Sequence, residues 1–493
     1  MCGIIGISSS YPVVADMYDG LSTLQHRGQD AAGIMTFDGS QFHSKRGDGL
    51  VRDVFRRSDV ERLQGSIGIG HVRYPTAGSY DVREAQPFYV NAPFGLALIH
   101  NGNLTNTSIL RDKINAKGVR HLNTSSDSEV LLNVFADALW KQKLKNIQPK
   151  KLFIAVGDTM KQIRGAYAVI VLIAGQGMLA FRDPSGLRPI SLGRRVGAAR
   201  DEYMFASESV SMTTLGYDFM GDLQPGEAVF IDNAGKMHRS SCAKPHWSPC
   251  IFEHVYLARP DAILDKVSVY KARLRAGSYL ATEVAKADLP IDVVVPVPDT
   301  SRTAALTVAN DLGVRYREGL MKNRYIARTF IMPTQAKRQK SIRHKLIPME
   351  LELRGKNVLL VDDSIVRGNT ARQIIAMVRD AGAKKVYLAS ASPALVSPCV
   401  YGVDMPTKKE LIASGLSTEQ VRKELKADAL FYLPLKDLIT SCLVGNAKIP
   451  KYCTACFTGK YPTREVTAAY LATAEKTRTS SKPKEGAGQM TLL

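Results

Sequence analysis

At 493 residues the chain is too long for one ordinary hydrophobic core, so we expect two domains with additional segments. A hydrophobic content of 45% and a charged content of 23% are typical of a globular protein and exclude a disordered or fibrous chain. The net charge of +20 raises the question of nucleic-acid binding.

The basic charge is concentrated in residues 315–345, which hold ten Lys or Arg and one acid, Glu318. No RNA- or DNA-binding motif accompanies this segment, so we predict no nucleic-acid partner. We interpret it as a loop that closes on a polyphosphate.

The longest apolar run, around residues 168–174, is too short to span a bilayer. The first residues lack the basic and apolar regions of a signal peptide, so we expect a cytoplasmic protein that binds no membrane. Seven cysteines, odd in number and scattered, do not fit a secreted disulfide framework. In a reducing compartment they indicate chemistry or a metal site.

Residues 1–235 read as short β-runs separated by turns, with two helices. Met17, Leu21 and Leu24 fall on one helical face, and residues 126–129 form a capping-box pattern that opens a second helix. Apolar runs predict strands at residues 66–72, 95–100, 166–174 and 228–231. The pattern predicts an α+β domain with antiparallel strands.

Residues 236–440 change to alternating strands and helices. The runs at 291–296 and 357–361 fit buried parallel strands, and a helix over 370–381 ends at Gly382. Residues 441–475 form a C-terminal segment that contains a Cys-x-x-Cys pair. Residues 476–493, rich in Ser, Lys, Gly and Pro, predict a disordered tail.

Cys2 directly follows the initiator Met, and its small side chain permits removal of Met1. A chain that begins with cysteine carries a thiol nucleophile and a free α-amine, whose reference pKa of about 7.7–8.0 suits proton transfer near neutral pH. A cysteine at the second position by itself indicates little, so its neighbours decide.

Four segments in order accompany Cys2, namely MCGIIG (1–6), QHRGQDAAG (25–33), GHVRYPTAG (70–78) and HNGNLT (100–105). Together they resemble the class II glutamine amidotransferase domain. The resemblance implies an N-terminal nucleophile hydrolase with a four-layer αββα sandwich.

The resemblance also implies roles for single residues. Arg73 and Thr76 match positions that bind glutamine, and a planar guanidinium suits the substrate carboxylate. Asp127 matches the residue that binds the α-ammonium group, although a carboxylate there is also a plain helix N-cap.

Asn101 and Gly102 match the family's oxyanion hole, with Cys2 as the nucleophile. The alternative for an Asn-Gly pair is an ordinary hairpin turn. His71 is interpreted as a structural hydrogen-bonding residue and not as the base, because the terminal amine fills that role.

A second site is expected at VLLVDDSIVRGNT, residues 358–370, where an apolar strand leads to two carboxylates, a loop of small residues and a helix. Such a loop presents backbone N–H groups and a helix N-terminus to a phosphate. The segment resembles the signature of type I phosphoribosyltransferases, in the version seen in amidophosphoribosyltransferases. It implies an α/β domain with a mostly parallel sheet.

The residues that the resemblance assigns to phosphoribosyl pyrophosphate (PRPP) are Lys322, Asp362, Asp363, Ser364, Arg367, Gly368, Asn369 and Thr370. Asn369 departs from the Thr common in the family, which puts phosphate affinity in doubt. The segment at 296–301 resembles the pyrophosphate loop, and Thr300, Asp362 and Asp363 are the implied Mg²⁺ ligands. Residues 322–331 resemble the loop that closes over the substrate, with Ala327 where many relatives have Gly.

Four of the remaining cysteines, Cys250, Cys399, Cys453 and Cys456, resemble the ligand set of relatives with a 4Fe–4S cluster. Thiolates also suit Zn²⁺, and some relatives have no metal, so the spacing leaves these three possibilities open. Cys242 and Cys442 are expected to be ordinary.

The whole resemblance, to about residue 465, implies an amidophosphoribosyltransferase that converts PRPP, glutamine and water into 5-phosphoribosylamine, glutamate and pyrophosphate. It further implies a homotetramer or homodimer and inhibition by purine nucleotides. Two alternatives remain. One is a sugar-phosphate amidotransferase with an isomerase-type domain, against which the loop at 362–370 argues. The other is a nucleotide-binding regulator on a phosphoribosyltransferase fold, which could hold RNA through the basic segment and does not need Cys2.

Overall fold

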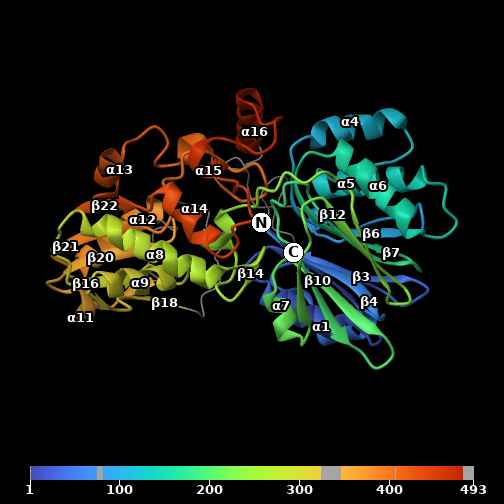
Figure 1. The fold of residues 1–493 in the computed structure, drawn as a ribbon, viewed down its shortest axis with the longest axis horizontal. Helices are drawn as coiled ribbons and strands as arrows, with labels where there is room; N and C mark the ends of the chain where they lie inside the picture. Colours follow the sequence, from blue (N-terminus) through green and yellow to red (C-terminus); the bar gives the residue numbers. More distant parts are fainter. Residues whose placement is uncertain (1, 75–81, 324–345, 406, 481–493) are drawn as a thin grey trace, which may run out of the picture.

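The computed structural model describes residues 2–74, 82–323, 346–405 and 407–480, with side chains to residue 475. Two lobes lie side by side (Figure 1), one built from strands β1 to β13 and the other around β16 to β22. Thr76, Ala327 and most of the predicted closing loop lie outside the described residues.

The first lobe contains two antiparallel sheets. The seven-stranded sheet has the order β11(Asp218–Asp222), β9(Ser191–Val196), β10(Asp201–Ala206), β1(Gly3–Ser8), β4(Ile67–Arg73), β2(Ala31–Phe37), β3(Phe42–Asp48). The six-stranded sheet has the order β13(Met237–Ser241), β12(Glu227–Asp232), β8(Gly177–Arg182), β7(Gly165–Ile173), β6(Leu96–Leu104), β5(Phe88–Val90).

The two sheets pack face to face, and β7 explains why. Its alternate residues divide between two cores: Ala168, Ile170 and Leu172 pack between the sheets, whereas Val169 and Val171 pack under the helices. A strand buried on both faces requires such a continuous apolar run, because successive side chains point to opposite faces.

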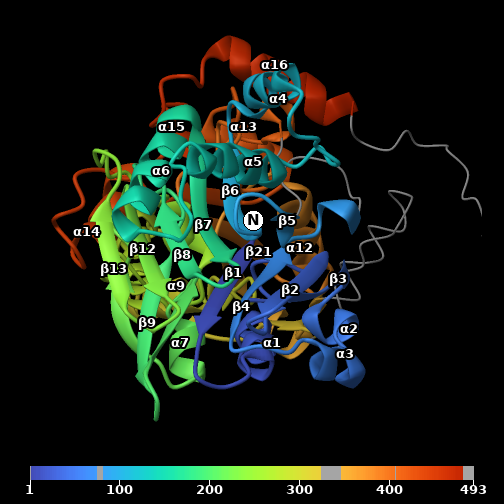
Figure 2. The same ribbon diagram turned by 90° about the vertical axis from the view of Figure 1, so that its right-hand side faces the viewer.

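Helices cover the outer face of each sheet (Figure 2). Those on the first sheet are α1(Val14–Thr23), α2(Val51–Val54), α3(Arg57–Arg62) and α7(Val210–Thr214), and those on the second are α4(Thr107–Lys117), α5(Asp127–Trp140) and α6(Pro149–Gln162). The predicted four-layer αββα sandwich is therefore confirmed.

The second lobe contains a five-stranded sheet in which every pairing is parallel. Its order is β17(Arg315–Tyr316), β16(Val293–Pro296), β20(Asn357–Asp362), β21(Lys385–Ser390), β22(Ala429–Tyr432). One face packs on α8(Val269–Ala285), α9(Arg302–Asp311) and α14(Leu435–Leu443), and the other on α11(Glu350–Leu353), α12(Asn369–Asp380) and α13(Thr418–Leu425). The predicted α/β class is confirmed.

Short elements complete the fold. They are the 3-10 turns η1(Val82–Glu84) and η3(Lys408–Glu410), the π-helical turn η2(Glu253–Leu257), the two-stranded antiparallel sheets β14(Ile263–Leu264)–β15(Val267–Ser268) and β18(Leu320–Lys322)–β19(Leu346–Pro348), and the helices α15(Ala455–Thr458) and α16(Ala468–Ser480). Among the described residues, no helix is both long and apolar enough to cross a membrane.

Two local expectations differ from the structure. Ser126 is the N-cap of α5, but Glu129 accepts hydrogen bonds from the backbone of Asn123 and Thr124 and does not close a capping box on Ser126. Helix α16 continues to Ser480, five residues into the segment predicted as disordered. Ala, Leu, Glu and Lys in residues 468–476 favour a helix more than the composition of the whole tail suggests.

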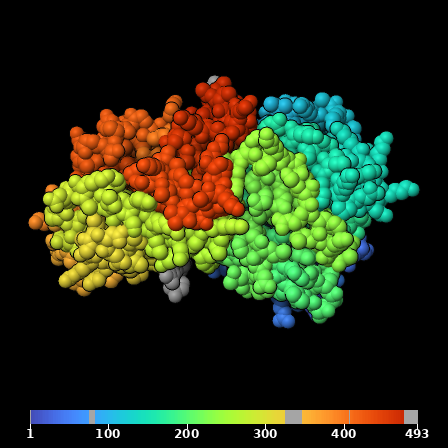
Figure 3. Space-filling view, in the orientation of Figure 1, coloured from blue at the N-terminus to red at the C-terminus, as the bar shows by residue number. Residues whose placement is uncertain are grey.

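The C-terminal segment lies where the lobes meet, as its red colour shows in Figure 3. Ala166 and Leu187 of the first lobe form one buried cluster with Val400, Tyr401 and Cys453. The lobes are therefore joined by a packed interface and not only by the chain.

Candidate active sites

Cys2 is half-buried at the start of β1 and faces β6 of the other sheet. Its backbone nitrogen donates to Oδ1 of Asn101 at 3.3 Å, and its Sγ lies 3.8 Å from the carbonyl oxygen of Tyr74. Asn101 is fully buried, and its amide nitrogen has no hydrogen-bond partner among the described residues. An N–H donor of this kind suits an oxyanion that forms next to the sulfur.

Asn101 and Gly102 lie inside β6, opposite Ala168 and Tyr167 of β7, so the hairpin-turn alternative is wrong. Gly102 has a φ of +153°, and a Cβ atom there would lie 2.0 Å from the carbonyl oxygen of Ala166. Only glycine fits this position without moving the strands apart.

Arg73 ends β4 and is 8% exposed. Its Nη2 donates to Oε2 of Glu84 at 2.6 Å, and the other carboxylate oxygen of Glu84 accepts from Ser125. Ser125 directly precedes the N-cap of α5, so Glu84 ties Arg73 to the start of this helix.

Asp127 is the first residue of α5, and its carboxylate accepts a 2.9 Å hydrogen bond from the backbone of Leu104, at the end of β6. Its Oδ2 lies 3.8 Å from Nδ1 of His100. Since Ser126 is the N-cap, Asp127 is not the cap of its own helix. The structure thus brings the expected cation, carboxylate and oxyanion residues to one end of β4 and β6.

His71 is fully buried in β4. Burial, with the nearby charge of Arg73, lowers the pKa of His71 to about 3, so the ring is neutral at pH 7. A neutral buried ring agrees with the interpretation that His71 is not a charged catalytic group, but neither ring nitrogen has a hydrogen-bond partner among the described residues, so the expected hydrogen-bonding role is not borne out.

The second candidate site begins where β20 ends at Asp362. Asp362 and Asp363 are half-buried, and Ser364 donates to Asp363 at 2.8 Å. Burial raises the pKa of both carboxyl groups, and that of Asp362 is raised further by the charge of Asp363. A cation stabilises two such neighbouring carboxylates in their charged form. Mg²⁺ in proteins is commonly bound by one or two carboxylates together with oxygen atoms of the substrate.

The loop after these carboxylates leads into α12. Gly368 is the N-cap with a φ of +74°, and a Cβ atom there would lie 2.3 Å from Cδ1 of Ile412. Asn369 and Thr370 are exposed in the first turn of the helix, and Oδ1 of Asn369 accepts from Arg372 at 3.2 Å. Arg367 is exposed and lies 3.6 Å from Glu410.

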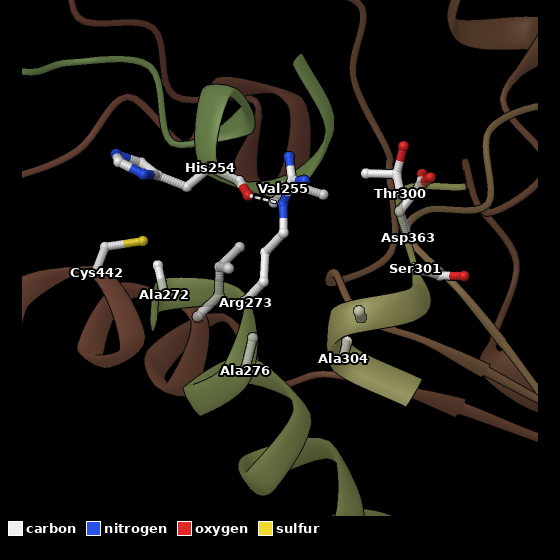
Figure 4. A pocket seen from close by; sticks show the side chains of 12 residues that line it. His254, Val255, Ala272, Arg273, Ala276, Thr300, Ser301, Ala304, Asp363 and Cys442 are labelled. Carbon is white, nitrogen blue, oxygen red and sulfur yellow. Dashed lines mark hydrogen bonds between the residues drawn. The ribbon is translucent and has the colours of Figure 1, made fainter. Parts of the chain in front are cut away.

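Asp363 and Thr300 line one cavity, together with an arginine that the sequence did not single out (Figure 4). Arg273 of α8 is 6% exposed and donates from Nε to the carbonyl oxygen of His254 at 2.9 Å and from Nη2 to that of Ala258 at 2.8 Å. Burial lowers the pKa of Arg273 to about 10. Lys322 lies next to this site, because its Nζ contacts Asp299 at 2.8 Å.

The four singled-out cysteines line a second cavity, together with Arg188 and Tyr401. Backbone hydrogen bonds hold the three cysteine segments together: Cys453 donates to Pro249, and Val396 donates to Cys456. Burial raises the pKa of Cys250, Cys453 and Cys456, and neighbouring thiols add to this effect.

Four thiols around one cavity are a donor set for soft metals. Thiolates suit an iron–sulfur cluster and also Zn²⁺, whose tetrahedral site needs four sulfurs each about 2.3 Å from one point. Among the described residues no three His, Cys, Asp or Glu side chains are placed to hold one metal ion.

Sequence reasoning missed several buried charged residues around these sites, namely Glu84, Arg182, Arg188, Glu208, Glu253, Asp265 and Arg273. Most of them find their partners far away in the chain, and even Glu84 meets Arg73 across 11 residues, so no local motif could reveal these pairs. The only available signal was the presence of charged residues inside otherwise apolar segments.

Two family models match the chain, a glutamine amidotransferase domain over residues 78–214 and a phosphoribosyl transferase domain over residues 269–392. The second match excludes an isomerase-type sugar domain over those residues. Among solved structures, a glutamine PRPP amidotransferase from Bacillus subtilis complexed with ADP and GMP is 36% identical, with a TM-score of 0.83 over 95% of this chain and 100% of that chain.

Curated relatives are more similar still. An amidophosphoribosyltransferase of Pseudomonas aeruginosa is 55% identical over 97% of this chain and 96% of its own length, and that of Escherichia coli is 52% identical over 96% and 94%. At this identity over nearly the full length, with both catalytic domains present, the chain belongs to the amidophosphoribosyltransferase family.

Proposed function

We propose that two sites in this chain divide the amidophosphoribosyltransferase reaction, with Cys2 releasing ammonia from glutamine and the loop after β20 binding PRPP. The observation that carries this proposal is the contact in which the backbone nitrogen of Cys2 donates to Oδ1 of Asn101 on the other sheet. This contact places the side-chain amide of Asn101 beside the nucleophile and leaves its Nδ2 donor without a partner among the described residues.

In the first half-reaction the thiolate of Cys2 attacks the glutamine side-chain amide, and the α-amine, exposed by removal of Met1, carries the proton. Asn101 and the backbone N–H of Gly102 stabilise the oxyanion. Arg73 and Thr76 bind the carboxylate of glutamine and Asp127 its ammonium group. Ammonia leaves, and water then hydrolyses the thioester to release glutamate.

In the second half-reaction ammonia displaces pyrophosphate at C1 of the ribose. Residues 364–370 and the N-terminus of α12 bind the 5′-phosphate, whereas Lys322 and Thr300 face the pyrophosphate. Mg²⁺, held by Thr300, Asp362 and Asp363, would supply positive charge to the departing pyrophosphate. Ammonia in bulk water is mostly protonated, so it must pass between the sites along a sheltered path.

Two variants test this division of labour. Cys2→Ala should abolish glutamine-dependent synthesis and keep synthesis from added ammonium, whereas Asp362→Asn with Asp363→Asn should abolish both. Phosphoribosylamine formation is measured with each nitrogen source. Equal loss of both activities in Cys2→Ala, or Met1 still attached to the active enzyme by mass spectrometry, refutes the proposal.

We further infer that Cys250, Cys399, Cys453 and Cys456 hold a 4Fe–4S cluster, supported by their common cavity. Anaerobically purified protein should be brown and contain about four irons per chain. Cys399→Ser should remove the iron, whereas Cys442→Ser should not, because Cys442 is a buried thiol that lines the cavity around Asp363 and not the cavity of the four cysteines. Colourless, iron-free protein contradicts the inference.

Regulation by purine nucleotides and assembly into a cytoplasmic homotetramer or homodimer are also proposed. The first is supported by the similar Bacillus subtilis protein complexed with ADP and GMP, and the second by the family resemblance. Nucleotide titration of the activity and sedimentation analysis test them, and an uninhibited or monomeric enzyme would oppose them.

A further inference from the structure

A cluster of four buried charges lies between the two lobes. Arg27 donates from Nη2 to Oε1 of Glu253 at 3.0 Å and from Nη1 to Glu208, and Nη1 of Arg188 lies 3.2 Å from Glu253. All four side chains are at most 3% exposed. The two positive charges balance two negative ones, so removal of one leaves an uncompensated buried charge.

This cluster reaches the glutaminase nucleophile directly. Nε of Arg27 donates to the backbone carbonyl oxygen of Cys2 at 3.2 Å. Burial by itself would lower the pKa of Arg27, but Glu253 and Glu208 raise it, so its charge is permanent. The position of Cys2 therefore depends on how Glu253 and Glu208 hold Arg27.

Glu253 is the first residue of the π-helical turn η2, and this turn reaches the other active site. Arg273, which shares its cavity with Asp363 and Thr300, donates to the carbonyl oxygen of His254 (Figure 4). It also donates to the carbonyl oxygen of Ala258. Residues 253–258 are thus held at one end by Arg27 and along their length by Arg273. π-helical turns are rare and are frequent at functional sites.

We propose that Glu253 is a positioning residue for Cys2 and that residues 253–258 transmit occupancy of the PRPP site to the glutaminase site. A diphosphate that attracts Arg273 pulls on the turn, and Glu253 then moves Arg27 and the backbone of Cys2. The inference rests on the proposed function of both sites.

A second buried ion pair provides a matched control. Arg182 of β8 binds Asp265, in the turn between β14 and β15, through two hydrogen bonds of 2.7 and 2.9 Å. Both partners are at most 5% exposed by their side chains, and the pair also joins the two lobes. Neither side chain hydrogen-bonds to Cys2 or to Arg27, although the charge of Asp265 partly offsets the burial that lowers the pKa of the nearby His254. Loss of this pair should therefore weaken the interface and leave the contacts of Glu253 with Arg27 and of Arg27 with Cys2 in place.

The experiment measures glutamine hydrolysis by the full-length enzyme, with and without PRPP, in Glu253→Gln and Asp265→Asn. In the parent enzyme PRPP should raise kcat/KM for glutamine. The measured ratio is kcat/KM with PRPP divided by kcat/KM without it, and in Glu253→Gln this ratio should fall by about 5-fold or more. Asp265→Asn should keep the parent ratio. Ammonium-dependent synthesis should persist in both variants, because it does not use Cys2.

Three results would overturn the inference: no response to PRPP in the parent, an unchanged ratio in Glu253→Gln, or an equal fall in Asp265→Asn. Glu253→Asp, which keeps the charge on a shorter side chain, replaces Glu253→Gln if that variant does not fold, and the same fall is expected. Failure of the proposed function is recognised separately, by Cys2→Ala that keeps glutamine-dependent synthesis.

Discussion

At the scale of single residues, Glu84 fixes the side chain of Arg73, which we propose binds the carboxylate of glutamine. Glu84→Gln should raise KM for glutamine by about 10-fold or more, since a charge-assisted hydrogen bond contributes about 1.5–3 kcal/mol, while ammonium-dependent synthesis should be unchanged. Steady-state kinetics with both nitrogen sources measure this. Ser125→Ala, which removes only the other partner of Glu84, should have a smaller effect. An equal loss of ammonium-dependent synthesis would mean that Glu84 has a general structural role.

His71 gives a prediction about acid stability. Its pKa is about 3 in the folded protein and 6.5 when unperturbed, so the unfolded chain takes up the proton first. The contribution of the neutral His71 ring to the free energy of unfolding is fully present above pH 6.5. It is lost as the pH falls towards 3, by up to about 1.4 kcal/mol per pH unit. Urea unfolding measures how much the free energy of unfolding falls between pH 7.5 and pH 5.5. This fall should be smaller for His71→Asn than for His121→Asn, in which an exposed histidine is replaced as a control. An equal fall in the free energy of unfolding in the two variants would contradict this prediction.

At the scale of elements, the close pairing of β6 with β7 depends on Gly102. Gly102→Ala should abolish glutamine hydrolysis, because the new Cβ atom would collide with the carbonyl oxygen of Ala166 and displace the oxyanion donors. Gly118→Ala is a suitable control: its φ is +64°, yet nothing lies within 4 Å, so only backbone strain of about 1–3 kcal/mol is added. Glutaminase assays and thermal unfolding compare the two. Retained hydrolysis in Gly102→Ala would exclude an oxyanion role for this strand.

At the scale of the whole molecule, two buried ion clusters join the lobes. Glu253→Gln and Asp265→Asn should both lower the melting temperature, since each leaves a buried arginine with less compensation, at a cost of about 3–5 kcal/mol. Scanning calorimetry of both variants measures this. Stability unchanged in both would show that packing alone, through clusters such as that of Val210, Ala262 and Leu264, holds the interface.

The sequence by itself determined the two domain classes and supplied the proposed site residues. Cys2, Asp362 and the strands that position them belong to continuous segments, in which residue order and apolar periodicity carry the information. The continuous apolar run of β7 and the helix that follows Gly368 were readable for the same reason. The capping of α5 and the length of α16 were not, because side-chain partners and neighbouring segments decide them.

Only the tertiary structure decided how the two sites are supported and joined. Arg27 meets Glu253 across 226 residues of chain, and Arg182 meets Asp265 across 83. A charged residue can be buried only with a partner of opposite charge, but many carboxylates in the sequence are equally suitable. The choice among them is made when the two lobes pack, and local sequence carries no record of it.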